Sequence, residues 1–248
     1  MIRSAFTIAA VFLGLSAVPL QAQDANKNNN GLQTGTRFER EPETADAAQA
    51  RWMQKRVANC VFNRNKGDVR EILANSNFYS IQFDAFDQDP DTLFDELNVD
   101  FCIERLMRRA DNRVYHTYMQ IQYSTLRNLL AEEAYLQDFD GPPSIGSATP
   151  RDVAGRFNGM RVHPQISTMA SLADCLTYHA SAQTHDLLRA RPGSDDEGEA
   201  ITALGPVIIS CANTQEQQLQ IPTSLIRQMA ADGLWSRSYY GSTAAGEG

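Results

Sequence analysis

The sequence predicts an all-α fold of two homologous helical units, related by a pseudo-two-fold internal repeat, each with one disulfide inside the unit. Apolar residues recur at helical spacing along most of the 248-residue chain, and such spacing gives a helix one face that it can bury. A segment near the end of the first half returns near the end of the second half. Each half also carries two cysteines in equivalent places.

Residues 1–22 have the features of a cleavable signal peptide. Arg3 supplies a positive start, residues 5–18 form an apolar run, and the small Ala22 precedes the expected cut. An uncleaved membrane anchor is the alternative, but 14 apolar residues fall short of the roughly 20 that cross a bilayer. We therefore expect a periplasmic or secreted protein with no transmembrane segment after cleavage.

The first helical unit is expected at residues 47–137, after a leader at residues 23–46. The leader is polar and charged with almost no apolar residues, so it cannot offset the entropy of ordering and is predicted to be disordered. A helix begins near Ala47, Gly67 interrupts it, and residues 68–71 resemble the capping box of a second helix.

The middle of the first unit contains another helix start. Asp89 precedes Pro90, and proline is favoured at the first helical position. Residues 119–123 then alternate like a short extended segment that leads into the last helix of the unit. The apolar face expected after Pro90 consists of Leu93, Phe94, Leu97, Phe101, Cys102 and Leu106.

The second unit is expected at residues 166–240, after a linker at residues 138–165 that holds four prolines and four glycines. An acidic run at residues 195–199 suits a helix N-terminus, which attracts negative charge. Pro206 is expected to kink or restart that helix. Residues 241–248 are small and polar and are predicted to form a disordered tail.

The repeat is clearest between residues 119–132 and 219–232. Without a gap, five of the 14 aligned positions are identical and five more are conservative. Upstream, two apolar residues lie 12 and 13 positions after the first cysteine of each half. The aligned charged positions are Arg127 with Arg227 and Glu132 with Asp232.

The repeat also selects among the cysteine pairings. Four cysteines allow three connectivities, and spacing alone does not choose between them. A unit that duplicated must once have closed its own bond, so we predict the disulfides Cys60–Cys102 and Cys175–Cys211. Closing loops of this length stabilises the folded state by roughly 4 kcal/mol each in the chain-entropy model.

The aligned arginines have two interpretations. An Arg guanidinium can tie its helix to backbone carbonyls or to an acidic helix N-terminus, which is a structural role. Alternatively, Arg127 and Arg227 form a pair of anion-binding sites. A basic patch, Arg105 with Arg108, Arg109 and Arg113, either contacts an acidic partner or anionic envelope polymer or is the cationic end of a helix.

No catalytic set, metal site or cofactor is predicted. The formal charge of −8 argues against a general nucleic-acid binder, because such proteins neutralise phosphates with Lys and Arg. The aspartates at residues 87–95 have the spacing of a calcium loop, but Thr92 replaces the turn glycine and Asn98 the closing glutamate. Glu132 and Glu133 point about 100° apart on a helix, so we expect a solvated face rather than an acid–base pair.

The two units, each containing Cys…Cys…[Leu/Ile]-Arg-x-[Leu/Met]-x-Ala-[Glu/Asp], resemble exported bacterial proteins of uncharacterised activity. The resemblance covers about residues 50–240 and implies no known activity. We interpret the chain as a non-catalytic interaction or scaffold module of the periplasm or envelope. The alternatives are a hydrolase that uses carboxylates such as Glu132 and Asp232 in a cleft between the units, and a small-ligand carrier.

Overall fold

A computed structural model describes most of the chain that follows the predicted leader. The predicted signal peptide and residues 23–45 of the leader lie outside the described residues, as does most of the linker. The described residues are 46–77, 81, 83–86, 89–109, 119, 121–145, 153, 164–212 and 221–246.

The described residues form helices joined by turns, with one isolated bridge between Ser76 and Ile81 and no strand. The all-α prediction is therefore confirmed for this part of the chain. None of the described helices is both long and apolar enough to cross a membrane. The elements are α1 (Ala47–Arg64), α2 (Lys66–Ala74), a 3-10 turn η1 (Phe83–Ala85), α3 (Pro90–Glu96), α4 (Val99–Arg109), α5 (Tyr123–Asp138), α6 (Pro164–His179), α7 (Ser181–Arg189), α8 (Asp195–Ala212) and α9 (Thr223–Gly246).

Helix α1 begins at the predicted residue because Asp46 caps it. The Asp46 carboxylate accepts a hydrogen bond of 2.7 Å from the backbone N–H of Gln49, which satisfies one of the unpaired donors of a helix start. The predicted interruption at Gly67 is wrong, because the chain breaks at Asn65 and Gly67 lies inside α2. Asp68 consequently sits in the first turn of α2 and is not its cap.

The break at Asn65 has a counterpart in the second half. Asn65 lies between α1 and α2 with φ −132° and ψ 44°, and Ala180 lies between α6 and α7 with φ −137° and ψ 42°. Each break comes five residues after the first cysteine of its half, Cys60 or Cys175. The two halves therefore turn at the same point with the same backbone conformation.

The helix start at Pro90 is confirmed, but the apolar face after it is divided between two helices. Asp89 caps α3 by accepting a 3.0 Å hydrogen bond from the N–H of Thr92. Asn98 then separates α3 from α4 in the left-handed region, with φ 53°, a conformation that asparagine tolerates better than most residues. Phe101 falls on the outer side and is left exposed.

Helices α8 and α9 of the second half are longer than α4 and α5 of the first half. Helix α8 begins at Asp195 with three acidic residues in its first turn, as predicted, and continues through Pro206. Helix α9 runs to Gly246, past Tyr240, where we expected the second unit to end. Before α8 the chain forms two helices, α6 and α7, which meet at Ala180.

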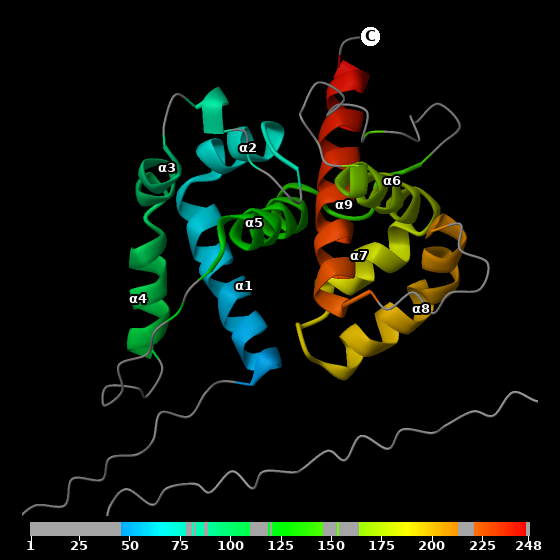
Figure 1. Cartoon of the computed structure of the whole chain (residues 1–248), viewed down its shortest axis with the longest axis horizontal. Coiled ribbons are helices and arrows are strands. Elements are labelled where there is room, and N and C mark those ends of the chain that lie inside the picture. The colour runs from blue at the N-terminus through cyan, green and yellow to red at the C-terminus, as the bar shows by residue number, and fades with distance from the viewer. Residues whose placement is uncertain are drawn as a thin grey trace, which may run out of the picture. The chain divides into compact units, whose positions relative to one another are not determined.

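Helices α5 and α9 pack against each other in the middle of the described helices (Figure 1). Helix α5 also contacts α1 and α2, and α9 contacts α6 and α7. On the outer sides, α4 packs on α1 and α8 packs on α6. One continuous hydrophobic core includes residues of both halves, with Tyr135 and Trp235 among its largest fully buried side chains.

The outer helices are attached covalently, and both predicted disulfides are confirmed. Cys60 on α1 bonds to Cys102 on α4, and Cys175 on α6 bonds to Cys211 on α8. The described part of the chain has no free cysteine. Each bond therefore fixes an outer helix to the first long helix of its own half.

Candidate functional site

The four aligned charged residues are buried where α5 meets α9. Arg127 is 0% exposed, Glu132 1%, and Arg227 and Asp232 5% each. A buried charge is costly unless an opposite charge and hydrogen bonds surround it. Their partners therefore decide whether these residues hold the fold or face a ligand.

Arg227, on α9, uses all three guanidinium nitrogens. Its Nε and Nη2 donate to the two carboxylate oxygens of Glu132 at 2.9 and 2.6 Å, a bidentate geometry that fixes both side chains. Its Nη1 donates to the carboxylate of Glu197 at 3.1 Å. The remaining donors reach the end of α7, where the carbonyl oxygens of Leu187, Leu188 and Ala190 accept at 2.9, 2.8 and 3.0 Å.

Glu132 also forms an ion pair with Lys55, which comes from α1. Burial opposes ionisation of this carboxyl group, but Arg227 and Lys55 outweigh it and hold the pKa of Glu132 below its ordinary value. Lys55 reaches Glu133 as well, with Nζ 3.2 Å from a carboxylate oxygen. The prediction of a solvated face at Glu132 and Glu133 is wrong, since both are at least 96% buried because α1 supplies the lysine that neutralises them.

Glu197 extends these contacts to the start of α1. Its carboxylate accepts two hydrogen bonds from the guanidinium of Arg51, at 3.1 and 2.9 Å, and one from the N–H of Gly193 at 2.7 Å. Gly193 has φ 80°, and a Cβ there would lie 2.1 Å from that of Ala48. A glycine is therefore required where α1 docks on the second half.

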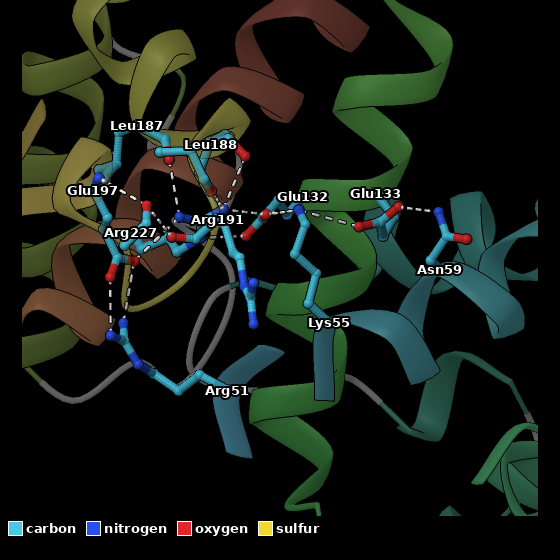
Figure 2. Close-up of polar contacts among 12 residues, drawn as sticks. Arg51, Lys55, Asn59, Glu132, Glu133, Leu187, Leu188, Arg191, Glu197 and Arg227 are labelled. Atoms are coloured by element: carbon cyan, nitrogen blue, oxygen red, sulfur yellow. Dashed lines mark hydrogen bonds and ion pairs between the residues drawn. The ribbon is translucent and has the colours of Figure 1, made fainter. Parts of the chain in front are cut away.

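We call these residues the buried charge network; its members are Arg51, Lys55, Glu132, Glu133, Glu197 and Arg227. Figure 2 shows the contacts running from Glu197 through Arg227 to Glu132, Lys55 and Glu133. The network joins α1, α5, α8 and α9. Each carboxylate faces at least one cation inside it, so its charges are already compensated.

Arg127, on α5, makes contacts that parallel those of Arg227. It donates to the carbonyl oxygens of Ser76 and Leu73, at 3.2 and 3.5 Å near the end of α2, and to the Ser76 hydroxyl at 2.8 Å. Its Nη1 lies 2.5 Å from a carboxylate oxygen of Asp232. Each arginine therefore reaches the second helix of its own half and the aligned acid of the other half.

A second kind of contact joins the first and last helices within each half. In the first half, Asn59 on α1 donates to Glu133 on α5 at 2.6 Å. In the second half the acid is on the first helix instead, because Asp174 on α6 forms an ion pair with Arg237 on α9. Arg237 also lies over the ring of Tyr178, 5.0 Å from its centroid.

The sequence had signalled the aligned residues but not their partners. We made no prediction for Lys55, Glu197, Asp174 or Arg237 as paired charges. Nothing in the sequence places α1 against α5 and α8, or α6 against α9. One usable signal was the five-residue interval from Arg127 to Glu132, which turns the two side chains about 140° apart on a helix. An arginine and an acid so spaced cannot pair with each other.

The exposed polar surface contains a groove between α1, α4 and α5, which we call the basic groove. Its volume is about 580 Å³. Arg105, from the predicted basic patch, lines it, whereas the side chains of Arg108 and Arg109 and all of Arg113 lie outside the described residues. The lining residues are Trp52, Lys55, Arg56, Asn59, Cys60, Asn63, Arg64, Cys102, Arg105, Leu106, Glu133 and Leu136.

Metal binding finds no support in the described part of the chain, where no group of three or more His, Cys, Asp or Glu side chains converges. Asp89, from the stretch with calcium-loop spacing, caps α3; Asp87 lies outside the described residues. His185 contacts the Tyr135 hydroxyl at 2.8 Å through Nδ1, and burial lowers the pKa of this histidine.

Comparisons with protein-family models, curated proteins and solved structures find no match to this chain.

Proposed function

We propose that this protein is an exported, non-catalytic interaction module that contacts its ligand through the basic groove. One observation carries the proposal: the carboxylates that a hydrolase would use are buried and neutralised inside the protein, whereas arginines of the groove are exposed. Glu132 is bound by Arg227 and Lys55, and Asp232 by Arg127. These residues are in place to hold the helices together.

The competing functions find less support than the interaction module in the described residues. The alternative hydrolase was expected to use carboxylates such as Glu132 and Asp232 in a cleft between the units. Those two residues are buried and paired, and the three hollows described in the structure each lie within one half. A small-ligand carrier needs an enclosed and largely apolar pocket. The basic groove is open rather than enclosed, and it presents charged and amide side chains beside Trp52, Leu106 and Leu136, which suits a ligand that binds at the surface.

We further propose that the two halves descend from one duplicated helical unit. The matching conformations at Asn65 and Ala180 support this origin. The parallel carbonyl contacts of Arg127 and Arg227 support it as well. On this proposal, the groove on the first half is a later specialisation of a shared scaffold.

An oxidising compartment is part of the proposal. Two disulfides within 248 residues are typical of exported proteins, since cytosolic thiols are kept reduced. The apolar run at residues 5–18 provides the export signal, and the module acts outside the cytoplasm. Its resemblance to exported bacterial proteins with the same duplicated motif is consistent with this location.

The test combines capture with a hydrolysis assay. The oxidised protein is immobilised and exposed to envelope extract, and is compared with the variant Arg56→Glu/Arg105→Glu and with Arg189→Glu, which changes an exposed arginine on α7 away from the groove. We expect the wild type and Arg189→Glu to retain the same component and the groove variant to lose it. Peptidoglycan or ester hydrolysis that Glu133→Gln abolishes would overturn the proposal.

A further inference from the structure

The arginines of the basic groove lack acidic partners within the described residues. Arg56 and Arg105 are exposed, and neither forms an ion pair there. Arg64 is also exposed and lies over the ring of Phe101, 4.4 Å from its centroid. In a chain of formal charge −8, three neighbouring arginines that pair with no carboxylate among the described residues repel one another, and a bound anion relieves that repulsion.

The groove is held in shape by covalent and ionic contacts. The Cys60–Cys102 disulfide lies in its lining and fixes α4 to α1. Glu133, the acidic residue of the lining, is engaged by Lys55 and Asn59. Arg56, Arg64 and Arg105 therefore remain to meet a ligand, and the walls that carry them are already fixed, which lowers the entropic cost of binding.

The groove also contains two amides. Asn59 donates to Glu133 and Asn63 donates to Asn59, and each amide oxygen keeps a lone pair for a further hydrogen bond. Asn59 and Asn63 are exposed one helical turn apart on α1, and the lining follows α1 from Trp52 to Arg64, over about 18 Å of helix. An amide carries both a donor and acceptor lone pairs, which complement the hydroxyl groups of a sugar. A carboxylate only accepts hydrogen bonds, so the amide oxygens do not complement it.

We propose, on the basis of the interaction module proposed above, that the groove binds an acidic oligosaccharide, with arginines on its carboxylates and amides on its hydroxyls. Peptide recognition fits less well. A helix needs a row of apolar anchors, whereas the apolar side chains of the lining are mainly Trp52, Leu106 and Leu136. Strand addition needs a sheet edge, and the described residues form no sheet.

The bound sugar is not expected to be cleaved. Glycoside hydrolysis ordinarily uses two carboxyl groups, one on each side of the scissile bond. Glu133 is the acid among the lining residues, and it is 4% exposed and paired with Lys55. Among the described residues, the groove therefore has the groups to hold an acidic glycan and lacks the second carboxyl group to hydrolyse it.

Isothermal titration of the oxidised full protein with tetragalacturonate tests the inference. We expect one site per chain and an affinity that falls as sodium chloride rises, because salt screens the ion pairs. Arg56→Gln and Arg105→Gln should each weaken binding about tenfold, since each removes a charge-assisted hydrogen bond. Asn63→Ala should weaken it by a smaller factor, and Arg189→Glu should leave it unchanged.

Three further probes decide the ligand class. Neutral galactose oligomers and sodium phosphate should bind far more weakly than tetragalacturonate. A glutamate tetrapeptide should bind the wild type and Asn63→Ala with the same affinity. Equal affinity for the tetrapeptide, or galacturonate binding unaffected by Arg56→Gln, would overturn the glycan assignment. If galacturonate does not bind while envelope capture still depends on Arg56 and Arg105, the glycan inference fails and the proposed interaction module stands. If galacturonate does not bind and envelope capture does not depend on these arginines, both proposals are overturned.

Discussion

Replacing Arg227 by methionine perturbs the buried charge network at its centre. Methionine keeps most of the volume and removes the guanidinium. The change leaves Glu132 and Glu197, which are 1% and 2% exposed, without their shared cation. It also removes the donors that satisfy the carbonyl oxygens at the end of α7. Two buried carboxylates and several carbonyl groups must then be accommodated with fewer partners.

The expected loss of folding free energy is about 3 to 5 kcal/mol, the usual cost of removing one partner of a buried ion pair. Lys55 still neutralises Glu132 and Arg51 still neutralises Glu197, which places the loss toward the lower end. The unsatisfied carbonyl groups add a cost of roughly 1 kcal/mol or more. Single domains have a free energy of unfolding of about 5 to 15 kcal/mol. The variant should therefore still fold, but with a much smaller free energy of unfolding.

Urea unfolding of the oxidised protein, followed by far-ultraviolet circular dichroism, measures this loss as a lower midpoint with an unchanged slope. Arg70→Met is the matched control, because Arg70 pairs with Asp138 but its side chain is 39% exposed. Exposed pairs contribute about 1 kcal/mol or less. If Arg227→Met costs no more than Arg70→Met, the network does not hold the two halves together.

Three other predictions concern packing, pH and the disulfides. Gly233→Ala should destabilise the protein by about 1 to 3 kcal/mol, because its Cβ would lie 2.7 Å from a side-chain atom of Thr177. Gly198 has open space around it, so Gly198→Ala should raise the free energy of unfolding by up to about 1 kcal/mol. Thermal unfolding compares the two variants. The folded-state pKa values of Glu132 and His185 are lowered, so the unfolded chain binds more protons than the folded protein as the pH falls. The free energy of unfolding should therefore decrease below about pH 6.5 through the histidine, and further near about pH 4 through the glutamate. A urea midpoint that rises on acidification would contradict this. Reducing both disulfides should cost several kcal/mol, with each bond contributing roughly 4 kcal/mol, and an unchanged urea midpoint in dithiothreitol would oppose it.

Features with a local cause were predictable from the sequence. The helix starts at Ala47 and Pro90 follow from the aspartates before them, and the acidic start of α8 follows from helix electrostatics. The disulfide pairing depended on the repeat, since spacing alone left three connectivities open. We predicted the helix break at Gly67 instead of Asn65 because glycine has the lower helix propensity. Propensity takes no account of tertiary contacts such as the hydrogen bond from the Asn65 amide to the carbonyl oxygen of Leu97.

The partners of the candidate residues depend on tertiary packing, which the sequence alone did not reveal. The alignment of residues 119–132 with 219–232 gave an arginine and an acid at matching positions, but it did not show that each arginine pairs with the acid of the opposite half. Lys55 lies on a helix whose contact with Glu132 requires α1 to pack on α5. The basic groove likewise brings Arg56 beside Arg105 only because α4 packs on α1.

A double-mutant cycle on Arg127 and Asp232 tests most directly the claim that the aligned charges bind one half to the other. Arg127→Met, Asp232→Leu and the double variant are unfolded in urea in the oxidised state. We expect a coupling energy of about 2 kcal/mol, with the double variant more stable than the Arg127→Met protein because it no longer buries a carboxylate that has lost its arginine. Additive losses, with coupling below about 0.5 kcal/mol, would contradict it.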